Sequence, residues 1–175
     1  RRESKIMKKL VVLVVFIIFI VGCSNVKIEN NNKISEEKES YLAIKNELNA
    51  KEEYISNDEL PCNVTISVDR INSEEISYRA IIDDPKVNMY NVKALLIHDY
   101  FTEDIFPSIG IFDDPENLII GSEEVKGISL VGYIETTKNI EELNLNIKLY
   151  IEYTDDEGNI NKVYYKLDNT KENTI

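Results

Sequence analysis

The sequence predicts an all-β fold in which two antiparallel sheets pack face to face as a sandwich. From residue 57 onward, apolar and polar residues alternate with a period of two, which is typical of strands with one buried and one solvated face. The alternating runs are short, and Asp, Asn, Pro and Gly separate them, as expected for turns between strands. Residues 57–168 are numerous enough to bury one core without a disulfide.

The stretch before this domain, residues 35–56, has a different pattern. It is rich in charge, and Tyr41, Ile44 and Leu48 recur at the three-to-four spacing of a narrow apolar stripe on a helix. Ser35 is a suitable N-cap. The pattern fits a helical stalk, or a helix laid on the domain, better than it fits a partner-binding amphipathic helix. Its acidic character argues against contact with an anionic membrane surface.

The alternation locates the strands in order along the domain. It predicts strands at residues 62–68, 76–82, 92–100, 128–134 and 143–153. After an acidic turn at 155–159, residues 163–167 return antiparallel to the preceding strand. Short strands are also expected at 109–112 and 118–120.

Strands of this number and length resemble an immunoglobulin-like β-sandwich in architecture, with a small barrel as the alternative. The resemblance does not extend to the immunoglobulin family. True immunoglobulin domains combine two cysteines with a tryptophan, whereas this chain has no Trp and its body contains Cys62 alone. We expect Cys62 to be a small buried hydrophobic residue.

The first residues have the pattern of a secretory signal peptide. Lys8 and Lys9 precede an uninterrupted apolar run at residues 10–21. As a helix this run is about 18 Å long, which is too short for a hydrocarbon core of about 30 Å. We therefore expect a signal peptide over residues 1–22, with residues 1–6 upstream of the true start at Met7.

The end of this segment, Ile20-Val21-Gly22-Cys23, resembles the lipobox of bacterial lipoproteins. The resemblance implies cleavage between Gly22 and Cys23, attachment of diacylglycerol and palmitate-type acyl chains to Cys23, and a protein held at the cell membrane on its extracytoplasmic side. Residues 23–34 are then a lipidated polar tether and residues 169–175 a polar tail. The alternative is a short transmembrane anchor with an incidental cysteine.

Charge and composition exclude several classes of function. The chain carries a formal net charge of −12. A group of basic residues lies in the leader, so the domain that follows is more acidic still and repels nucleic acid. One His and two Cys rule out His-rich or Cys-rich zinc sites. His98 stands next to Asp99, but adjacent strand residues point to opposite faces, so we interpret His98 as an interface or strand-end residue.

Paired acidic residues offer a weak candidate for a metal site. One pair is Asp83 and Asp84 and the other is Asp113 and Asp114, and a proline follows each pair. Such pairs either contribute oxygens to Ca²⁺ or form ordinary turns, and we favour turns. The acidic turn at 155–159 does not match an EF-hand, because a lysine occupies the twelfth position. We predict no other cofactor.

Aromatic residues gather in the stretch 89–112, and loops at sandwich ends commonly carry recognition. The candidate binding edge there consists of Tyr100, Phe101, Phe106 and Phe112. The chain is expected to be an anchored interaction module, not an enzyme, that binds an envelope protein or a wall polymer. The alternatives are a carboxylate-dependent glycan hydrolase of the cell envelope and a Ca²⁺-binding structural subunit of an envelope complex.

Overall fold

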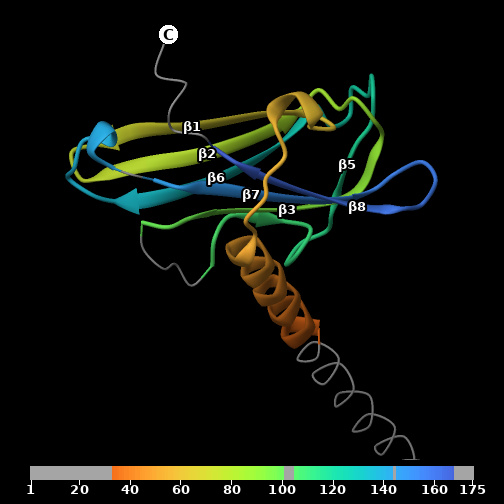
Figure 1. Ribbon diagram of the computed structural model, residues 1–175, viewed down its shortest axis with the longest axis horizontal. Coiled ribbons are helices and arrows are strands. Elements are labelled where there is room, and N and C mark those ends of the chain that lie inside the picture. Colours follow the sequence, from red (N-terminus) through yellow and green to blue (C-terminus); the bar gives the residue numbers. More distant parts are fainter. Residues whose placement is uncertain (1–32, 101–104, 144, 168–175) are drawn as a thin grey trace, which may run out of the picture. The chain divides into compact units, whose positions relative to one another are not determined.

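The computed structural model describes residues 33–100, 105–143 and 145–167 (Figure 1). The chain divides into two compact units, one ending at Glu39 and one running from Ser40 to the end. The expected signal peptide, its cleavage site at Gly22 and Cys23, most of the tether, and the polar tail lie outside the described residues.

The second unit contains two antiparallel sheets, as predicted. The first sheet has the order β1-β2-β6, with β1 at Asn63–Asn72, β2 at Glu75–Asp83 and β6 at Gly127–Glu135. The second has the order β4-β3-β7-β8, with β3 at Met89–His98, β4 at Ser108–Ile109, β7 at Ile147–Thr154 and β8 at Ile160–Lys166. A short strand, β5 (Glu116–Leu118), also pairs with β3.

This strand order is that of immunoglobulin-like sandwiches. The first two strands share a sheet with the later strand β6, while β3 pairs with β7 and β7 with β8 in the other sheet. Because no described strand pairs across the two sheets, the alternative of a small barrel is wrong. The two-sheet prediction is confirmed.

The core follows from the alternation. In β2 the side chains of Ile76, Tyr78, Ala80 and Ile82 are buried, and in β6 those of Ile128, Leu130 and Ile134. They meet inward-facing residues of β3, β7 and β8 in one large cluster, which also contains Cys62. Burial of the Cys62 side chain raises the pKa of its thiol to about 12.

Several predicted strand boundaries were wrong by a few residues. The run 143–153 becomes a strand only at Ile147, because a 3₁₀ turn, η2 (Ile140–Glu142), precedes it. β3 starts at Met89 and ends at His98 instead of spanning 92–100. β4 ends at Ile109, because the next residue, Gly110, has a φ of 71°, which is outside the extended region. Only glycine fits there, since a Cβ would lie 2.7 Å from the Val92 carbonyl oxygen.

Residues 33–50 are helical, whereas the sequence predicted a helix over 35–56. After residue 50 the chain has no regular secondary structure before β1, apart from a second 3₁₀ turn, η1 (Asn57–Glu59). Along this segment the Ile55 N–H donates to the Tyr164 carbonyl of β8 at 2.9 Å. The structure contains no described helix that is long and apolar enough to cross a membrane.

The apolar stripe of the helix, Tyr41, Ile44 and Leu48, is buried against the outer face of the second sheet. It forms a second cluster with Leu95, Ile97, Phe106, Ile111 and Tyr150. This explains why β3 is apolar on both faces: one faces the other sheet and one faces the helix. Residues 40–50 therefore lie on the domain, within the compact unit that starts at Ser40.

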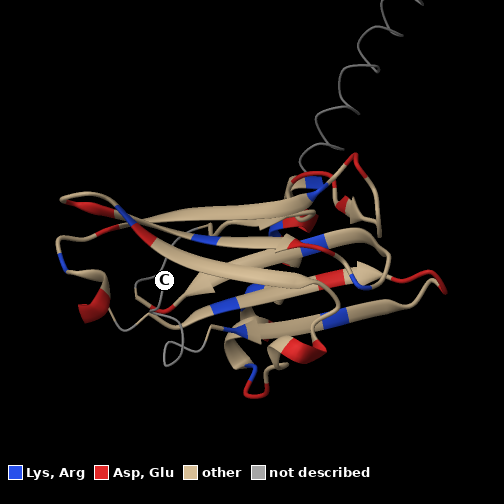
Figure 2. Cartoon of the chain, turned by 90° about the horizontal axis from the view of Figure 1, so that it is seen from above, with Lys and Arg blue, Asp and Glu red and all other residues tan. Residues whose placement is uncertain are grey.

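Many acidic residues gather in turns and short helical segments at the ends of strands, and long stretches of the strands carry no charge (Figure 2). This distribution leaves parts of the sandwich edge uncharged.

Candidate functional site

A groove of about 520 Å³ lies at one edge of the sandwich. One wall comes from β6, the edge strand of the first sheet, and the other from residues 105–113, which include β4 at the edge of the second sheet. The described residues that line it are Ile105, Phe106, Pro107, Ser108, Phe112, Asp113, Val131, Gly132 and Tyr133.

Three large apolar or aromatic side chains remain exposed around this groove. Ile105 is 63% exposed, Tyr133 is 56% exposed and Phe112 is 39% exposed. Exposed apolar area costs about 25 cal/mol per Å² relative to burial, and clustered exposure marks interaction sites. The groove is therefore suited to binding a partner with apolar side chains.

The predicted binding edge is brought together only in part. Phe106 and Phe112 both line the groove, but Phe106 is buried and forms its base. Tyr100 is half-buried and its hydroxyl pairs with the Thr136 hydroxyl at 3.2 Å, outside the groove lining. Phe101 lies outside the described residues.

The helix holds the base of the groove in place. The Phe106 backbone N–H donates a buried hydrogen bond to the Tyr41 hydroxyl at 2.8 Å. The Lys45 ammonium lies 4.7 Å from the centroid of the Phe106 ring, a cation–π contact. Two helix residues thus fix one residue of the groove.

A chain of aromatic contacts supports the same base from inside the sandwich. The Tyr78 and His98 rings meet edge to face with centroids 4.8 Å apart, and the His98 and Phe106 rings do so at 5.1 Å. His98 is the last residue of β3, as the strand-end interpretation requires, and its Nδ1 accepts the Tyr100 N–H at 3.2 Å.

The neighbour of His98, Asp99, has a different partner. Its carboxylate accepts the Asn146 backbone N–H at 2.9 Å and also the Asn146 side-chain amide. The pair His98 and Asp99 is therefore not arranged like a catalytic dyad, in which the carboxylate orients the imidazole.

Gly132 sets the shape of the β6 wall. It stands directly opposite Tyr78 in the β2–β6 register, and a Cβ at Gly132 would lie 2.2 Å from the Tyr78 Cζ atom. No real side chain tolerates that distance, so the Tyr78 ring occupies the space that glycine leaves.

An acidic hollow adjoins the groove at the end of β6. Its described lining contains Glu74, Glu75 and Glu135, together with Asn72, Thr136 and Thr137. Glu75 and Glu135 stand directly opposite one another across β2 and β6. Like charges in this position repel. The Arg70 guanidinium already lies beside this hollow, where it donates to the Asn72 and Thr136 carbonyls at 3.1 Å.

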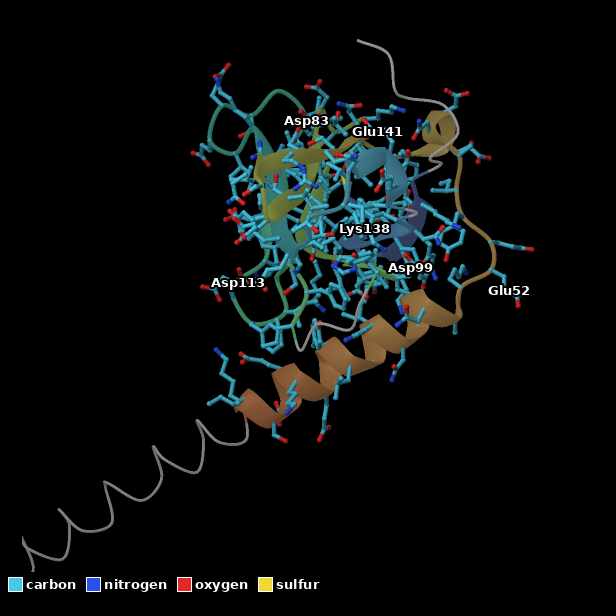
Figure 3. The ribbon with its side chains drawn as sticks, turned by 90° about the vertical axis from the view of Figure 1, so that its left-hand side faces the viewer. Glu52, Asp83, Asp99, Asp113, Lys138 and Glu141 are labelled. Atoms are coloured by element: carbon cyan, nitrogen blue, oxygen red, sulfur yellow. The ribbon has the colours of Figure 1, made fainter. Side chains whose placement is uncertain are left out.

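The Asp pairs behave as turn residues. Asp83 accepts the Asn63 side-chain amide at 2.8 Å, and Asp113 accepts the Gly110 N–H at 2.6 Å. Asp84 has a φ of 43°, and Asp114 is exposed. Asp83 and Asp113 lie on well-separated parts of the domain (Figure 3). Within the described ranges, no group of three or more His, Cys, Asp or Glu side chains is arranged to hold a metal ion.

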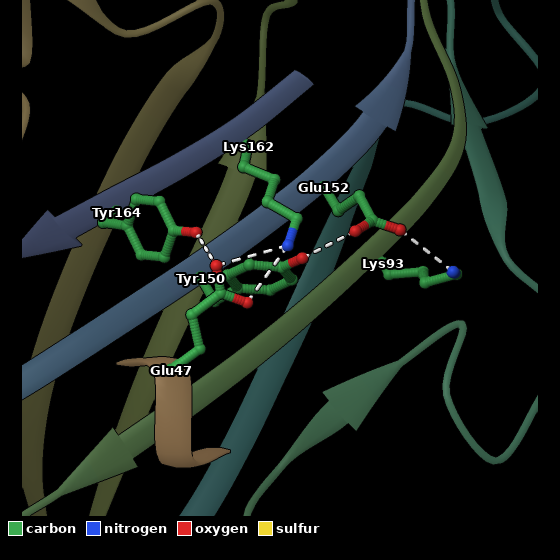
Figure 4. Close-up of polar contacts among 6 residues, drawn as sticks. All are labelled: Glu47, Lys93, Tyr150, Glu152, Lys162 and Tyr164. Carbon is green, nitrogen blue, oxygen red and sulfur yellow. Dashed lines mark hydrogen bonds and ion pairs between the residues drawn. The ribbon is translucent and has the colours of Figure 1, made fainter. Parts of the chain in front are cut away.

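A polar network ties the helix to β8 (Figure 4). Glu47 accepts hydrogen bonds from the Tyr164 hydroxyl and, at 3.0 Å, from the Lys162 ammonium. The Tyr164 hydrogen bond is the main cause that lowers the pKa of Glu47, and Lys162 adds to it against partial desolvation. This network stabilises the docked helix. None of its residues lines either of the two hollows described above.

A second set of polar contacts links β7 to β3, and the Lys162 ammonium, 5.9 Å from the centroid of the Tyr150 ring, lies between the two sets. Burial raises the pKa of Glu152, but hydrogen bonds from Tyr150 at 2.7 Å and Lys93 at 2.9 Å outweigh it, so the net shift is downward. Desolvation and the bond to Glu152 both raise the pKa of Tyr150. These groups stabilise one another's charge states and are positioned as structural partners.

No protein-family model and no curated protein matches this chain. The function must therefore be argued from the groove and from the sequence pattern of the leader.

Sequence reasoning missed Ile105, Val131 and Tyr133 as parts of the site. Tyr133 falls on the solvated face of an alternating strand, where a single aromatic residue is ordinary. Only the strand order, which puts β6 at an edge beside β4, makes it part of a groove.

Proposed function

We propose that this protein is a membrane-anchored extracytoplasmic lipoprotein whose β-sandwich is an interaction module, and that the groove beside β6 is its binding surface. The observation that carries the proposal is the set of three exposed side chains, Ile105, Phe112 and Tyr133, around one groove of an otherwise acidic domain. Partner binding would remove this apolar area from water.

The lining of the groove supports binding over hydrolysis. Glycan hydrolysis requires two carboxyl groups that face one another across the substrate. Asp113 is the one carboxylate among the described lining residues, and one of its oxygens already accepts the Gly110 N–H.

The anchor rests on the lipobox-like sequence at residues 20–23. Diacylglycerol on Cys23 supplies two acyl chains, which meet the two-signal requirement for stable membrane attachment. The domain would then be presented on the outer side of the membrane.

A labelling experiment in cells tests the anchor. Bacteria that express the full chain are grown with an alkyne analogue of palmitate and then fractionated. We expect label on the protein in the membrane fraction, and expect the Cys23→Ser variant to lose the label and the membrane association. A labelled Cys23→Ser variant, or unlabelled wild type in the cytosol, would contradict the proposal.

A further inference from the structure

The edge of β6 that borders the groove carries unpaired backbone groups. Among the described residues, β6 pairs with β2 alone. Just beyond the strand ends, the Thr136 N–H donates to the Glu74 carbonyl at 2.8 Å, so even-numbered residues of β6 direct their backbone groups toward β2. By alternation, the N–H and C=O groups of Ser129, Val131 and Tyr133 point outward.

The other sheet edges are short, irregular or covered. β4 has two residues and β5 has three. At β8 the segment that follows the helix donates the Ile55 N–H to the Tyr164 carbonyl. β1 carries charges at Asp69 and Arg70 and loses regular register between Arg70 and Asn72. Proteins use such devices to prevent strand addition.

β6 has none of these devices along its middle. It is nine residues long, follows a continuous register with β2, and has Glu135 at its end as its one charged residue. Its outward-facing residues Val131 and Tyr133 also line the groove. An unprotected edge therefore coincides with an apolar hollow.

The groove has the geometry that an added strand needs. Side chains of a strand alternate between its two faces, so a strand beside β6 directs every second side chain toward the other sheet. There they would contact Phe106, Pro107 and Phe112. The remaining side chains would lie on the solvated face beside Tyr133 and Glu135, which are exposed.

Charge indicates what those solvated side chains are. Glu135 closes β6, and Glu74 and Glu75 share its hollow. A Lys or Arg in the position opposite Glu135 would pair with it and lie near the Tyr133 ring, a favourable site for a cation.

We propose that β6 accepts an extended peptide segment of a partner protein as an added antiparallel strand, with apolar side chains in the groove and basic side chains beside Tyr133 and Glu135. This inference rests on the proposed function and specifies its ligand class. Main-chain hydrogen bonds to Val131 and Tyr133 would give affinity, and the alternating side chains would give specificity.

A second copy of this chain fits the edge less well. In a β6–β6 pair, the inward residues of each strand remain in their own core, so the groove stays empty. Each chain also carries a net charge of −12, and two such bodies repel.

The test uses residues 23–175 with Cys23→Ser and a capped probe peptide, Lys-Ile-Lys-Leu-Lys-Val-Lys. In an antiparallel pair, directly opposed residues with facing backbone groups have side chains on the same face. The probe residues that bond to Val131 and Tyr133 therefore share the solvated face of these residues, and these are the lysines. The lysine amides face β6, whereas the amides of Ile, Leu and Val face away from it. Two versions of equal charge are compared. One is N-methylated on the amides of the second, third and fourth lysines of the probe, and the other on the amides of its three apolar residues.

We expect the probe to bind, the apolar-methylated version to bind within about threefold of it, and the lysine-methylated version to lose at least about tenfold in affinity. At a probe concentration about ten times Kd, amide exchange at Ser129, Val131 and Tyr133 should slow about tenfold. Equal binding of both methylated versions, or unchanged exchange at these amides, would overturn strand addition. Absence of binding by the probe would also overturn strand addition.

A matched pair of variants completes the test. Val131→Pro removes an outward N–H that the β2–β6 ladder does not use, so the fold should persist. Val68→Pro removes an outward N–H on β1, whose even-numbered residues face away from β2 by the same alternation. Because the Val68 side chain also packs against the core, binding is compared at a temperature where both variants are folded. We expect Val131→Pro alone to abolish probe binding, and an equal loss in both variants contradicts the assignment. Side-chain shifts at Phe112 without amide protection would reject strand addition and leave the groove as the binding surface.

Discussion

The Tyr41 hydroxyl accepts a hydrogen bond from the Phe106 backbone N–H at 2.8 Å, within the cluster between the helix and the outer face of the second sheet. Phe106 forms the base of the groove. The helix that precedes the sandwich is therefore structurally coupled to the candidate binding site.

Replacing Tyr41 by Phe tests this coupling. The ring and its contact with Phe112 stay, but the buried Phe106 N–H loses its acceptor. An unsatisfied buried donor costs about 1–3 kcal/mol of unfolding free energy, which urea denaturation measures. Tyr54→Phe is the control, because the Tyr54 hydroxyl donates only to the nearby Lys51 carbonyl. A stability loss no greater in Tyr41→Phe than in the control would contradict the coupling.

Gly132→Ala tests the packing of the β6 wall. The new Cβ would overlap the Tyr78 ring, and overpacking of this kind costs about 1–3 kcal/mol. Adding Tyr78→Leu should recover part of the loss, so the double variant is more stable than the sum of the single effects. Strict additivity in a double-mutant cycle would show that the ring does not set this requirement.

The lowered pKa of Glu47 makes the docked helix sensitive to acid. A carboxyl whose pKa is lower in the folded than in the unfolded state contributes stability above its ordinary pKa of 4.5, and this contribution is lost as pH falls through the folded value. Glu47→Gln should therefore lower Tm at pH 7, and the two Tm curves should converge as the pH falls below 4.5 and through the lower folded value. Glu53→Gln, at an exposed carboxylate outside the network, should follow the wild type. Parallel curves for Glu47→Gln and wild type would refute this role.

Cys62 should be chemically inert in the folded protein. Its side chain is 1% exposed, and burial raises the pKa of the thiol to about 12, so thiolate is scarce at neutral pH. With Cys23→Ser in place, we expect an aromatic disulfide reagent at pH 8 to label Cys62 only after denaturant is added. Labelling of the native protein at the rate of the unfolded protein would mean that this part of the core opens readily.

The alternating pattern predicted most of the strands, because a half-buried strand imposes a period of two on its sequence. It was less informative for β3, whose two faces are both apolar. The sequence contained the reason, since Leu95 and Ile97 complement the stripe of Tyr41, Ile44 and Leu48. That the two surfaces meet is a tertiary fact, which neither pattern specifies alone.

The site was predictable in part for a similar reason. Phe106 and Phe112 belong to a single aromatic stretch, which composition reveals. Tyr133 and Gly132 come from a strand about twenty residues away, and they join the groove only because β6 lies at the sheet edge and opposes Tyr78 in register. The fit of Gly132 to Tyr78 depends on that register.

Photo-crosslinking in intact cells tests the central claim, that the groove beside β6 binds a partner protein, most directly. Benzoylphenylalanine is placed at Tyr133 in the full chain, with a matched placement at Ile160, which is 69% exposed on β8. We expect position 133 to give one dominant adduct, joined to a segment with alternating apolar and basic residues, and position 160 to give none of it. The same adducts at both positions, or a partner captured at 160 alone, would contradict the account.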